Sequence, residues 1–197
     1  MKNHIDQSLG SYFQDLGALY TRTEATGADG EALPLEDAHV RAIELIRDSV
    51  SGGGKVMFIG NGGSAAIASH MAIDYWKNGG LRAVAFNDGA LLTCVGNDFG
   101  YSHVFEKPIE MFGQSGDVLV AISSSGSSEN ILAGARAAAN LGCEVLTCSG
   151  FAPDNPLRSL GAINFYVPSG SYGFVEIAHL TLCHSILDCG FTDRSSG

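Results

Sequence analysis

Two short loops of small polar residues have the composition of a binding site for an oxygen-rich anion. Residues 60–64 (Gly-Asn-Gly-Gly-Ser) follow the apolar run 56–59, and residues 123–128 (Ser-Ser-Ser-Gly-Ser-Ser) follow the apolar run 118–122. Glycines let backbone N–H groups converge on one oxygen, serine hydroxyls add donors, and the N-terminus of a following helix supplies a partial positive charge. Neither loop fits the GxxxxGK[ST] or GxGxxG pattern of nucleotide sites. One loop alone is equally well explained as a turn with a serine helix cap, but two loops at equivalent places favour a phosphate site.

Ionisable side chains that could move a proton or bind a metal are concentrated on two expected helices. His70 and Asp74 are four residues apart and share one face of the helix that follows the first loop. The last helix carries Glu176, His179, His184 and Asp188. Glu176 and His179 form one same-face pair, and His184 and Asp188 form another. Taken singly, each histidine is more often structural than a ligand, and the carboxylates are equally compatible with a solvated helix face.

The hydrophobic pattern predicts the elements that must position these residues. Apolar runs of strand length alternate with stretches of helical periodicity. The expected strands are residues 55–59, 83–86, 117–122, 144–148 and 163–167, and the expected helices are residues 64–77, 89–95, 104–111, 128–141 and 174–187. This alternation predicts an α/β fold with a doubly wound, five-stranded parallel sheet flanked by helices. Ligands of such sheets bind beyond the carboxyl ends of the strands, where both loops lie.

The first 51 residues are predicted to be helical and to precede the α/β core of residues 55–190. The apolar stripe of the first helix consists of Ile5, Leu9, Phe13, Leu16 and Leu19. Residues 25–30 interrupt this pattern, and a second helix is expected over residues 37–50, before three consecutive glycines. With 197 residues, of which 45% are hydrophobic, the chain is expected to form one domain over residues 1–197.

The charge balance argues against several classes of partner. The formal net charge is −10, and no cluster of lysine or arginine offsets it, so neither nucleic acid nor an anionic membrane is an expected partner. Any phosphate site must then rely on local dipoles. The first residues lack the hydrophobic segment of a signal peptide, and the apolar runs are of strand length, so a cytoplasmic protein is expected.

Three motifs together resemble those of bacterial sedoheptulose-7-phosphate isomerases, also called phosphoheptose isomerases. They are residues 60–64, the segment 94–100 (Cys-Val-Gly-Asn-Asp-Phe-Gly) and the serine-rich loop 123–128. The resemblance extends from about residue 54 to residue 187, and the Asn-Asp-Phe-Gly segment beside the other two motifs is its specific part. It implies a single sugar-isomerase (SIS) domain of flavodoxin-like fold, with N-terminal helices that form oligomers. It also implies a homotetramer with sites between subunits.

The resemblance further implies an activity and a set of site residues. The activity is conversion of a ketoheptose phosphate to an aldoheptose phosphate, for the synthesis of heptose, a surface polysaccharide or a specialised glycoside. The implied substrate contacts are Asn61, Gly62, Gly63, Asn97, Asp98, Ser123, Ser124, Ser125 and Ser128. Ser64, at the helix start, is expected to add a further hydroxyl donor. The implied metal and acid-base positions are His70, Asp74, Glu176 and His184, and the expected cofactor is a divalent metal, zinc in many relatives.

This sequence departs from the family at the catalytic positions. The family has Glu where Asp74 stands and Gln where Glu176 stands. Compared with the family, this chain therefore has a shorter acidic side chain at Asp74 and an additional carboxylate on the last helix. The family usually has an arginine a few residues after the position of Asp74, and this arginine is replaced near Lys77. An aspartate that the family has before the last helix is replaced by Gly173. We therefore expect Glu176 or Asp74 to act as the base, and His184 as the acid. Glu176 and His184 are separated by about 12 Å along one helix, which favours a site completed by a neighbouring subunit.

The altered catalytic residues leave two non-catalytic alternatives open. One is a SIS protein without activity that binds a replication initiator protein, and the other is a module that senses a phosphosugar. The retained histidines and carboxylates favour an aldose-ketose isomerase. Product analysis with ketose phosphates of different lengths would separate these possibilities.

Overall fold

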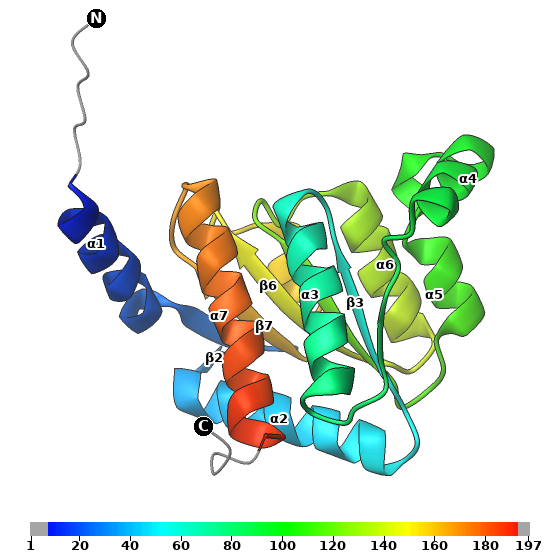
Figure 1. Cartoon of the computed structure of the whole chain (residues 1–197), viewed down its shortest axis with the longest axis horizontal. Coiled ribbons are helices and arrows are strands. Elements are labelled where there is room, and N and C mark those ends of the chain that lie inside the picture. Colours follow the sequence, from blue (N-terminus) through cyan, green and yellow to red (C-terminus); the bar gives the residue numbers. More distant parts are fainter. Residues whose placement is uncertain (1–7, 193–197) are drawn as a thin grey trace, which may run out of the picture.

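The computed structural model describes residues 8–192 and contains one seven-stranded sheet between two layers of helices (Figure 1). The strands are β1 (Glu24–Gly27), β2 (Ala32–Leu33), β3 (Val56–Gly60), β4 (Ala83–Ala85), β5 (Val118–Ser123), β6 (Glu144–Gly150) and β7 (Ile163–Val167). The helices are α1 (Leu9–Arg22), α2 (Leu35–Ser51), α3 (Gly63–Lys77), α4 (Gly89–Phe99), α5 (Glu106–Phe112), α6 (Glu129–Asn140) and α7 (Tyr172–Gly190), with short 3-10 turns at Tyr101–His103 and Pro156–Ser159. The strand order is β2-β1-β7-β6-β5-β3-β4.

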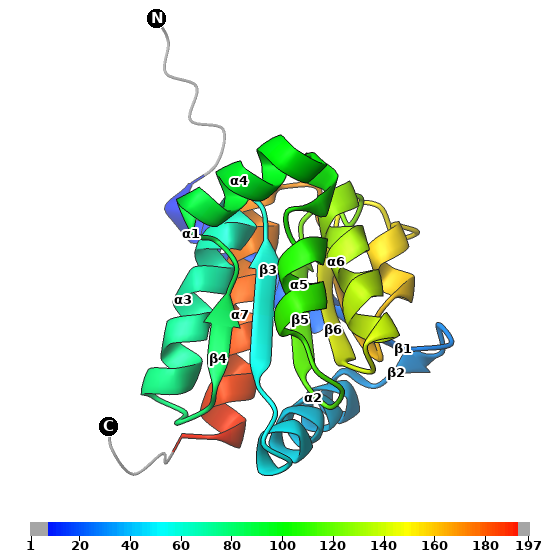
Figure 2. The same cartoon turned by 90° about the vertical axis from the view of Figure 1, so that its right-hand side faces the viewer.

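Side chains along the central strands point alternately to the two faces of the sheet, so the hydrophobic core has one half on each face. On β3, Val56 and Phe58 pack with α2, α3 and α7, whereas Met57 and Ile59 pack with α5 and α6 on the other face. Figure 2 shows α3 and α7 on one side of β3 and α5 and α6 on the other. Because both faces are covered, β3 and β5 are buried along their whole length and are almost entirely apolar, as is typical of parallel strands.

The five predicted strands are confirmed to within two residues at each end, and they are parallel to one another. The predicted number of strands was wrong, because β1 and β2 extend the sheet in antiparallel orientation beyond β7. These strands are only four and two residues long and contain alanine and glycine, which give no strong strand signal. The position of β1 depends on the distant strand β7, and β2 pairs only with β1. The Nδ2 group of buried Asn164 on β7 donates to the carbonyls of Thr26 (3.3 Å) and Gly27 (3.2 Å).

Helices α1 and α4 are among those that leave large apolar side chains exposed. In α1 only Leu19 is buried, while Leu9 and Phe13 are 71% and 60% exposed. In α4 no residue is buried, although the helix is largely apolar, and Phe99 is 56% exposed. The predicted first and second helices are otherwise confirmed, except that Ile5 lies outside the described residues. Within residues 8–192, no helix combines the length and apolar character needed to cross a membrane.

Candidate functional site

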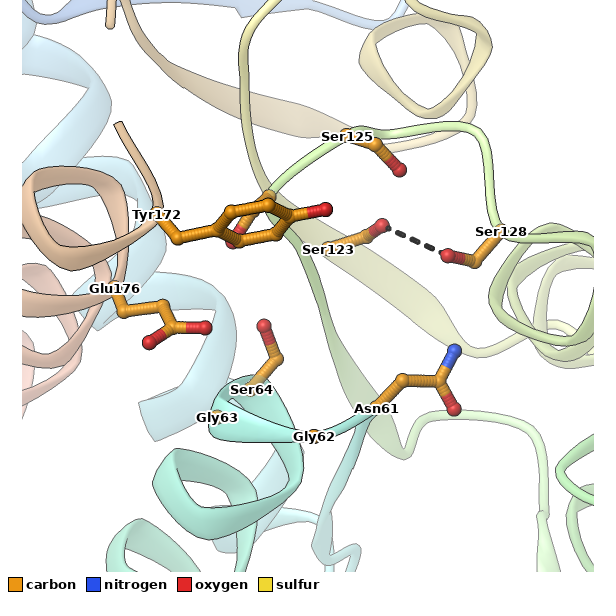
Figure 3. Close-up of a pocket in the computed structure, with 10 residues that line it drawn as sticks. Asn61, Gly62, Gly63, Ser64, Ser123, Ser125, Ser128, Tyr172 and Glu176 are labelled. Atoms are coloured by element: carbon orange, nitrogen blue, oxygen red, sulfur yellow. Dashed lines mark hydrogen bonds between the residues drawn. The ribbon is translucent and has the colours of Figure 1, made fainter. Parts of the chain in front are cut away.

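Both polar loops meet in a cavity of about 200 Å³ at the carboxyl ends of β3 and β5 (Figure 3). The residues that line it are Asn61, Gly62, Gly63, Ser64, Ser123, Ser124, Ser125, Ser128, Tyr172 and Glu176. The structure thus brings together eight of the ten residues expected to contact a substrate, and it adds the expected catalytic residue Glu176. Tyr172 was not identified from the sequence.

Three helices begin at this cavity, α3 at Gly63, α6 at Glu129 and α7 at Tyr172. None of the three has a side-chain hydrogen bond at its N-cap, whereas Ser8 caps α1 and Asp88 caps α4. The first N–H groups of these helices are therefore available to a ligand, and the aligned peptide dipoles favour an anion. Among the described residues that line the cavity there is no lysine or arginine. The site is suited to a phosphate held by neutral donors.

The backbone of the serine loop is fixed by a glycine in the left-handed region. Gly126 has φ +62°, and its N–H donates to the carbonyl of Ser123 (3.0 Å). A Cβ at this position would also collide with the side chain of Asn155. Asn155 in turn donates to the carbonyls of Ala152 (2.8 Å) and Gly150 (3.2 Å). Glycine is needed here for both conformation and space.

Glu176 places a carboxylate inside the cavity. Its side chain lies against Gly63, where a Cβ would collide with both carboxylate oxygens. Figure 3 shows the carboxylate on the side of the cavity opposite Asn61 and Ser128. No hydrogen bond or ion pair joins it to another residue of the described chain. The arrangement gives a phosphate-sized site with one available base beside it.

The side-chain amide of Asn61 bonds to two neighbouring side chains. Its Oδ1 atom accepts hydrogen bonds from Nδ2 of Asn130 (2.9 Å) and from the hydroxyl of Tyr101 (3.0 Å), and its own Nδ2 donates to Oδ1 of Asn130 (2.8 Å). Asn130 is 3% exposed. These interactions hold the first loop against the start of α6. Asn130 and Tyr101 were not identified from the sequence, because only the fold places them beside Asn61.

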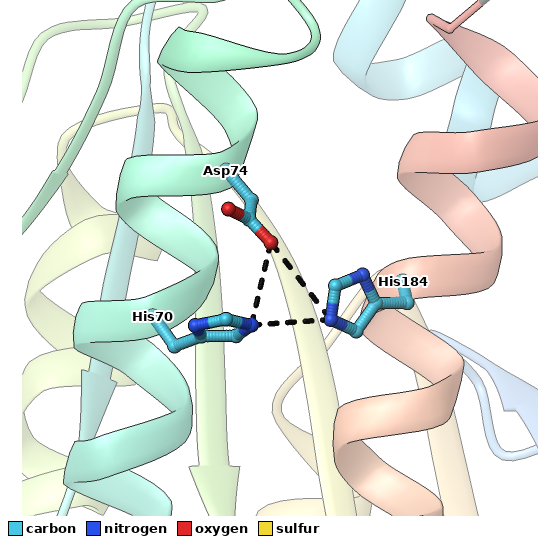
Figure 4. Close-up of side chains that lie close together, drawn as sticks. All are labelled: His70, Asp74 and His184. Carbon is cyan, nitrogen blue, oxygen red and sulfur yellow. Dashed lines mark hydrogen bonds and ion pairs between the residues drawn. The ribbon is translucent and has the colours of Figure 1, made fainter. Parts of the chain in front are cut away.

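A second group of side chains lies between α3 and α7, about two turns along α7 from Glu176 (Figure 4). His70 Nε2 is 3.3 Å from His184 Nε2 and 3.3 Å from Asp74 Oδ2, and His184 Nε2 is 3.9 Å from the same carboxylate oxygen. Two imidazoles and a carboxylate converging in this way fit a divalent metal such as zinc, with positions left for another ligand. Glu176, expected in this set, is not part of it. The structure divides the four predicted metal residues between a three-residue cluster and the cavity.

Asn97 and Asp98 do not reach the cavity within this chain. Both are exposed on α4, where Asn97 Nδ2 donates to Asp98 Oδ1 (2.8 Å) and Cys94 Sγ donates to Asp98 Oδ2 (3.7 Å). The specific part of the sequence resemblance therefore lies on the helix that has no buried residue.

His179 faces the core and does not share the cavity with Glu176. It is completely buried, and its Nε2 bonds to the carbonyl oxygen of Ser149 at 3.0 Å, as a donor in the neutral tautomer with Nε2 protonated. No hydrogen-bond partner for its Nδ1 exists in the part of the chain that the structure describes. Burial lowers the pKa of His179 to about 4. Its role is structural, as the more common behaviour of a single histidine suggests.

We expect acid to destabilise the wild type more steeply than the variant His179→Gln. An unfolded histidine titrates near pH 6.5, whereas the pKa of folded His179 is about 4, so the unfolded state binds a proton first as the pH falls. The stability from neutral His179 is complete above pH 6.5 and is lost as the pH falls toward 4, by about 3 kcal/mol in total. Urea unfolding at several pH values measures the difference between the two slopes. Parallel profiles would show that His179 does not titrate differently on folding.

Comparison with known proteins gives consistent matches. Residues 11–150 match the family model described as the SIS domain. The phosphoheptose isomerase of Helicobacter hepaticus is 30% identical over 194 residues, covering 95% of this chain and 92% of the relative. The phosphoheptose isomerase of Burkholderia pseudomallei is 39% identical over 155 residues, covering 75% of this chain and 76% of the relative.

Solved structures agree with these matches. The structure of phosphoheptose isomerase from Neisseria gonorrhoeae superposes with a TM-score of 0.80 at 31% identity, covering 92% of this chain and 96% of that one. A phosphoheptose isomerase from Francisella tularensis gives a TM-score of 0.79 at 29% identity, covering 91% of this chain and 94% of that one. Matches of this extent in sequence and fold place the chain in the SIS domain family, among the phosphoheptose isomerases.

Proposed function

We propose that the protein is an aldose-ketose isomerase that converts sedoheptulose 7-phosphate to the aldoheptose phosphate, for heptose biosynthesis. The observation that carries this proposal is the Glu176 carboxylate inside a cavity formed by three helix N-termini. The relatives named phosphoheptose isomerase support the substrate. Isomerisation requires removal of a proton alpha to the carbonyl, an enediol, and return of the proton to the adjacent carbon.

Glu176 is the proposed base, since it is the only carboxylate among the described residues that line the cavity. Asp74, the other candidate, lies in the histidine cluster, 3.3 Å from His70 Nε2. In this mechanism Glu176 removes the proton from the carbon next to the carbonyl, and the helix N-termini hold the phosphate. The acid role of His184 stays a prediction.

His70, Asp74 and His184 are the proposed ligands of a divalent ion, zinc in the first instance. A bound ion of this kind supplies a Lewis acid that polarises an oxygen of the substrate. The ligand side chains are accessible, because His70 and His184 are 53% and 33% exposed. A long carbon chain anchored at the serine loop could extend along α3 and α7 toward them.

The test of this function is incubation with sedoheptulose 7-phosphate and with shorter and longer ketose phosphates, followed by NMR of the products. We expect the aldoheptose phosphate and no product from ketose phosphates of five carbons. Binding without turnover would instead favour the phosphosugar-sensing alternative. The absence of nucleic-acid or membrane partners and a cytoplasmic location stay predictions from the sequence.

Replacing Ser125 and Ser128 together by alanine should weaken binding of the sugar phosphate by at least about tenfold per hydroxyl. Both residues line the cavity, and a hydrogen bond to a charged group contributes about 1.5–3 kcal/mol. Calorimetric titration measures the loss. Ser127→Ala is the matched control, since Ser127 is exposed in the same loop and is not among the lining residues. Unchanged affinity in the double variant would contradict the assignment of this loop to the phosphate.

We further propose a homotetramer in which neighbouring chains complete the site. The exposed apolar residues of α1 and the absence of buried residues in α4 support association through these helices. Association through α4 would also give Asn97 and Asp98 a route to another chain's cavity.

Analytical ultracentrifugation should therefore give a species of about four chains, and Phe13→Glu should dissociate it at least in part. A charge at an exposed position costs nothing in an isolated chain but opposes burial in an interface. A monomer with full activity would contradict the proposed assembly.

A further inference from the structure

Tyr172 places an aromatic ring in the cavity, where the other lining residues are small or polar. It is the first residue of α7 and is 63% exposed. Figure 3 shows its ring extending from α7 toward the serine loop, on the same side of the cavity as Glu176. The remaining side chains of the lining offer hydroxyls, one amide and one carboxylate. Tyr172 is therefore the main apolar surface available to a ligand at this site.

The ring of Tyr172 is supported by Phe151, which has an unusual backbone. The two ring centroids are 4.8 Å apart with an interplanar angle of 82°, an edge-to-face contact. Phe151 has φ +59° and, within residues 8–192, is the only residue other than glycine with positive φ. Two hydrogen bonds hold this conformation. The N–H of Phe151 donates to the carbonyl of Ser169 (3.0 Å), and its own carbonyl accepts from the hydroxyl of Tyr166 (2.9 Å).

A left-handed phenylalanine is unfavourable, and such residues persist mainly where the surrounding structure requires them. Glycine would fit this backbone without strain, but it would leave Tyr172 without its aromatic neighbour. Phe151 therefore has an unfavourable backbone conformation, and its side chain supports the ring of Tyr172 at the cavity. This combination points to a role for the ring in binding.

We propose that Tyr172 is a specificity-determining residue that packs its ring on the carbon chain of the bound sugar phosphate. This inference rests on the proposed function and adds to it the residue that distinguishes an organic phosphate from inorganic phosphate. The helix N-termini and serines recognise the phosphate group, which both ligands share. The aromatic ring recognises the C–H groups of the sugar carbons, which only the sugar phosphate carries. Phe151 acts as a positioning residue for the ring.

The test is calorimetric binding of sedoheptulose 7-phosphate and of inorganic phosphate to the full chain and its variants. Tyr172→Ala should lower the affinity for the sugar phosphate about tenfold, the scale of one aromatic contact, and change that for inorganic phosphate less than about twofold. Tyr172→Phe should bind both ligands like the wild type. Phe112→Ala is the matched control, because Phe112 is 57% exposed and stacks on Phe86, but lies on α5 away from this cavity.

The role of Phe151 is tested by coupling. Phe151→Leu should weaken sugar phosphate binding in the wild type and have no further effect in Tyr172→Ala, whereas a merely structural role would weaken both ligands in both backgrounds. Equal affinity of the wild type and Tyr172→Ala for the sugar phosphate would overturn the inference and leave the proposed function intact. Failure of the wild type to bind the sugar phosphate at all would overturn both.

Discussion

Glu176→Gln should lower kcat for sedoheptulose 7-phosphate by about a hundredfold to ten-thousandfold, the contribution typical of a positioned general base. The amide has nearly the same shape as the carboxylate but cannot accept the proton from the substrate carbon. Because the carboxylate lies against Gly63 and has no other partner among the described residues, its removal should not disturb the fold. NMR assays of product formation measure kcat, and calorimetry measures substrate binding, which should be largely retained.

The matched control is Asp188→Asn, which makes the same chemical change at an exposed position on the same helix. It should leave turnover unchanged. The Glu176 variant is informative in a second respect, because it restores the residue that the family resemblance leads us to expect there. Full activity of Glu176→Gln would mean that the base is another residue, and Asp74→Asn would then be the next variant to assay.

The parts of the fold that follow local rules were predictable from the sequence. The central strands are largely apolar runs bounded by turn residues, and the polar loops lie at the ends of β3 and β5. The carboxyl ends of parallel strands meet at one edge, so the meeting of the two loops also followed. Strands β1 and β2 did not follow, since β1 pairs with β7, more than 130 positions away, and β2 pairs only with β1.

The same distinction applies to the site. Spacing on one helix was sufficient to pair His70 with Asp74, and the structure confirms this proximity. Within one chain Glu176 does not join His184, as their separation of eight residues on one helix led us to expect, so a joint role for them needs a site completed by a neighbouring subunit and stays a prediction. Tyr172 and Phe151 could not be identified, because neither an aromatic residue at a helix start nor one directly after a strand carries a local signal of what it faces.

The chain should bind one divalent metal ion, and His184→Ala should remove most of this binding. His70, Asp74 and His184 bring three ligand atoms within 4.8 Å of one another, the number of protein ligands typical of a catalytic zinc site. Loss of one imidazole leaves two ligands and a correspondingly weaker site. Elemental analysis of purified protein measures the bound metal. Thermal unfolding with added zinc provides a readout independent of activity, since an ion at 100 times its Kd stabilises a protein by about 2.7 kcal/mol.

His103→Ala is the control for the metal measurement, because the His103 side chain is also accessible (42% exposed) but pairs with Glu106 on a separate part of the chain. It should bind zinc and show the zinc-dependent rise in Tm like the wild type. If the wild type contains no metal after purification without chelators, and zinc does not raise its Tm, then the cluster is an ion-pair and hydrogen-bond network between α3 and α7. Its contribution would then be to packing of the two helices that position Gly63 and Glu176, and polarisation of the substrate carbonyl would have to come from hydrogen-bond donors at the cavity.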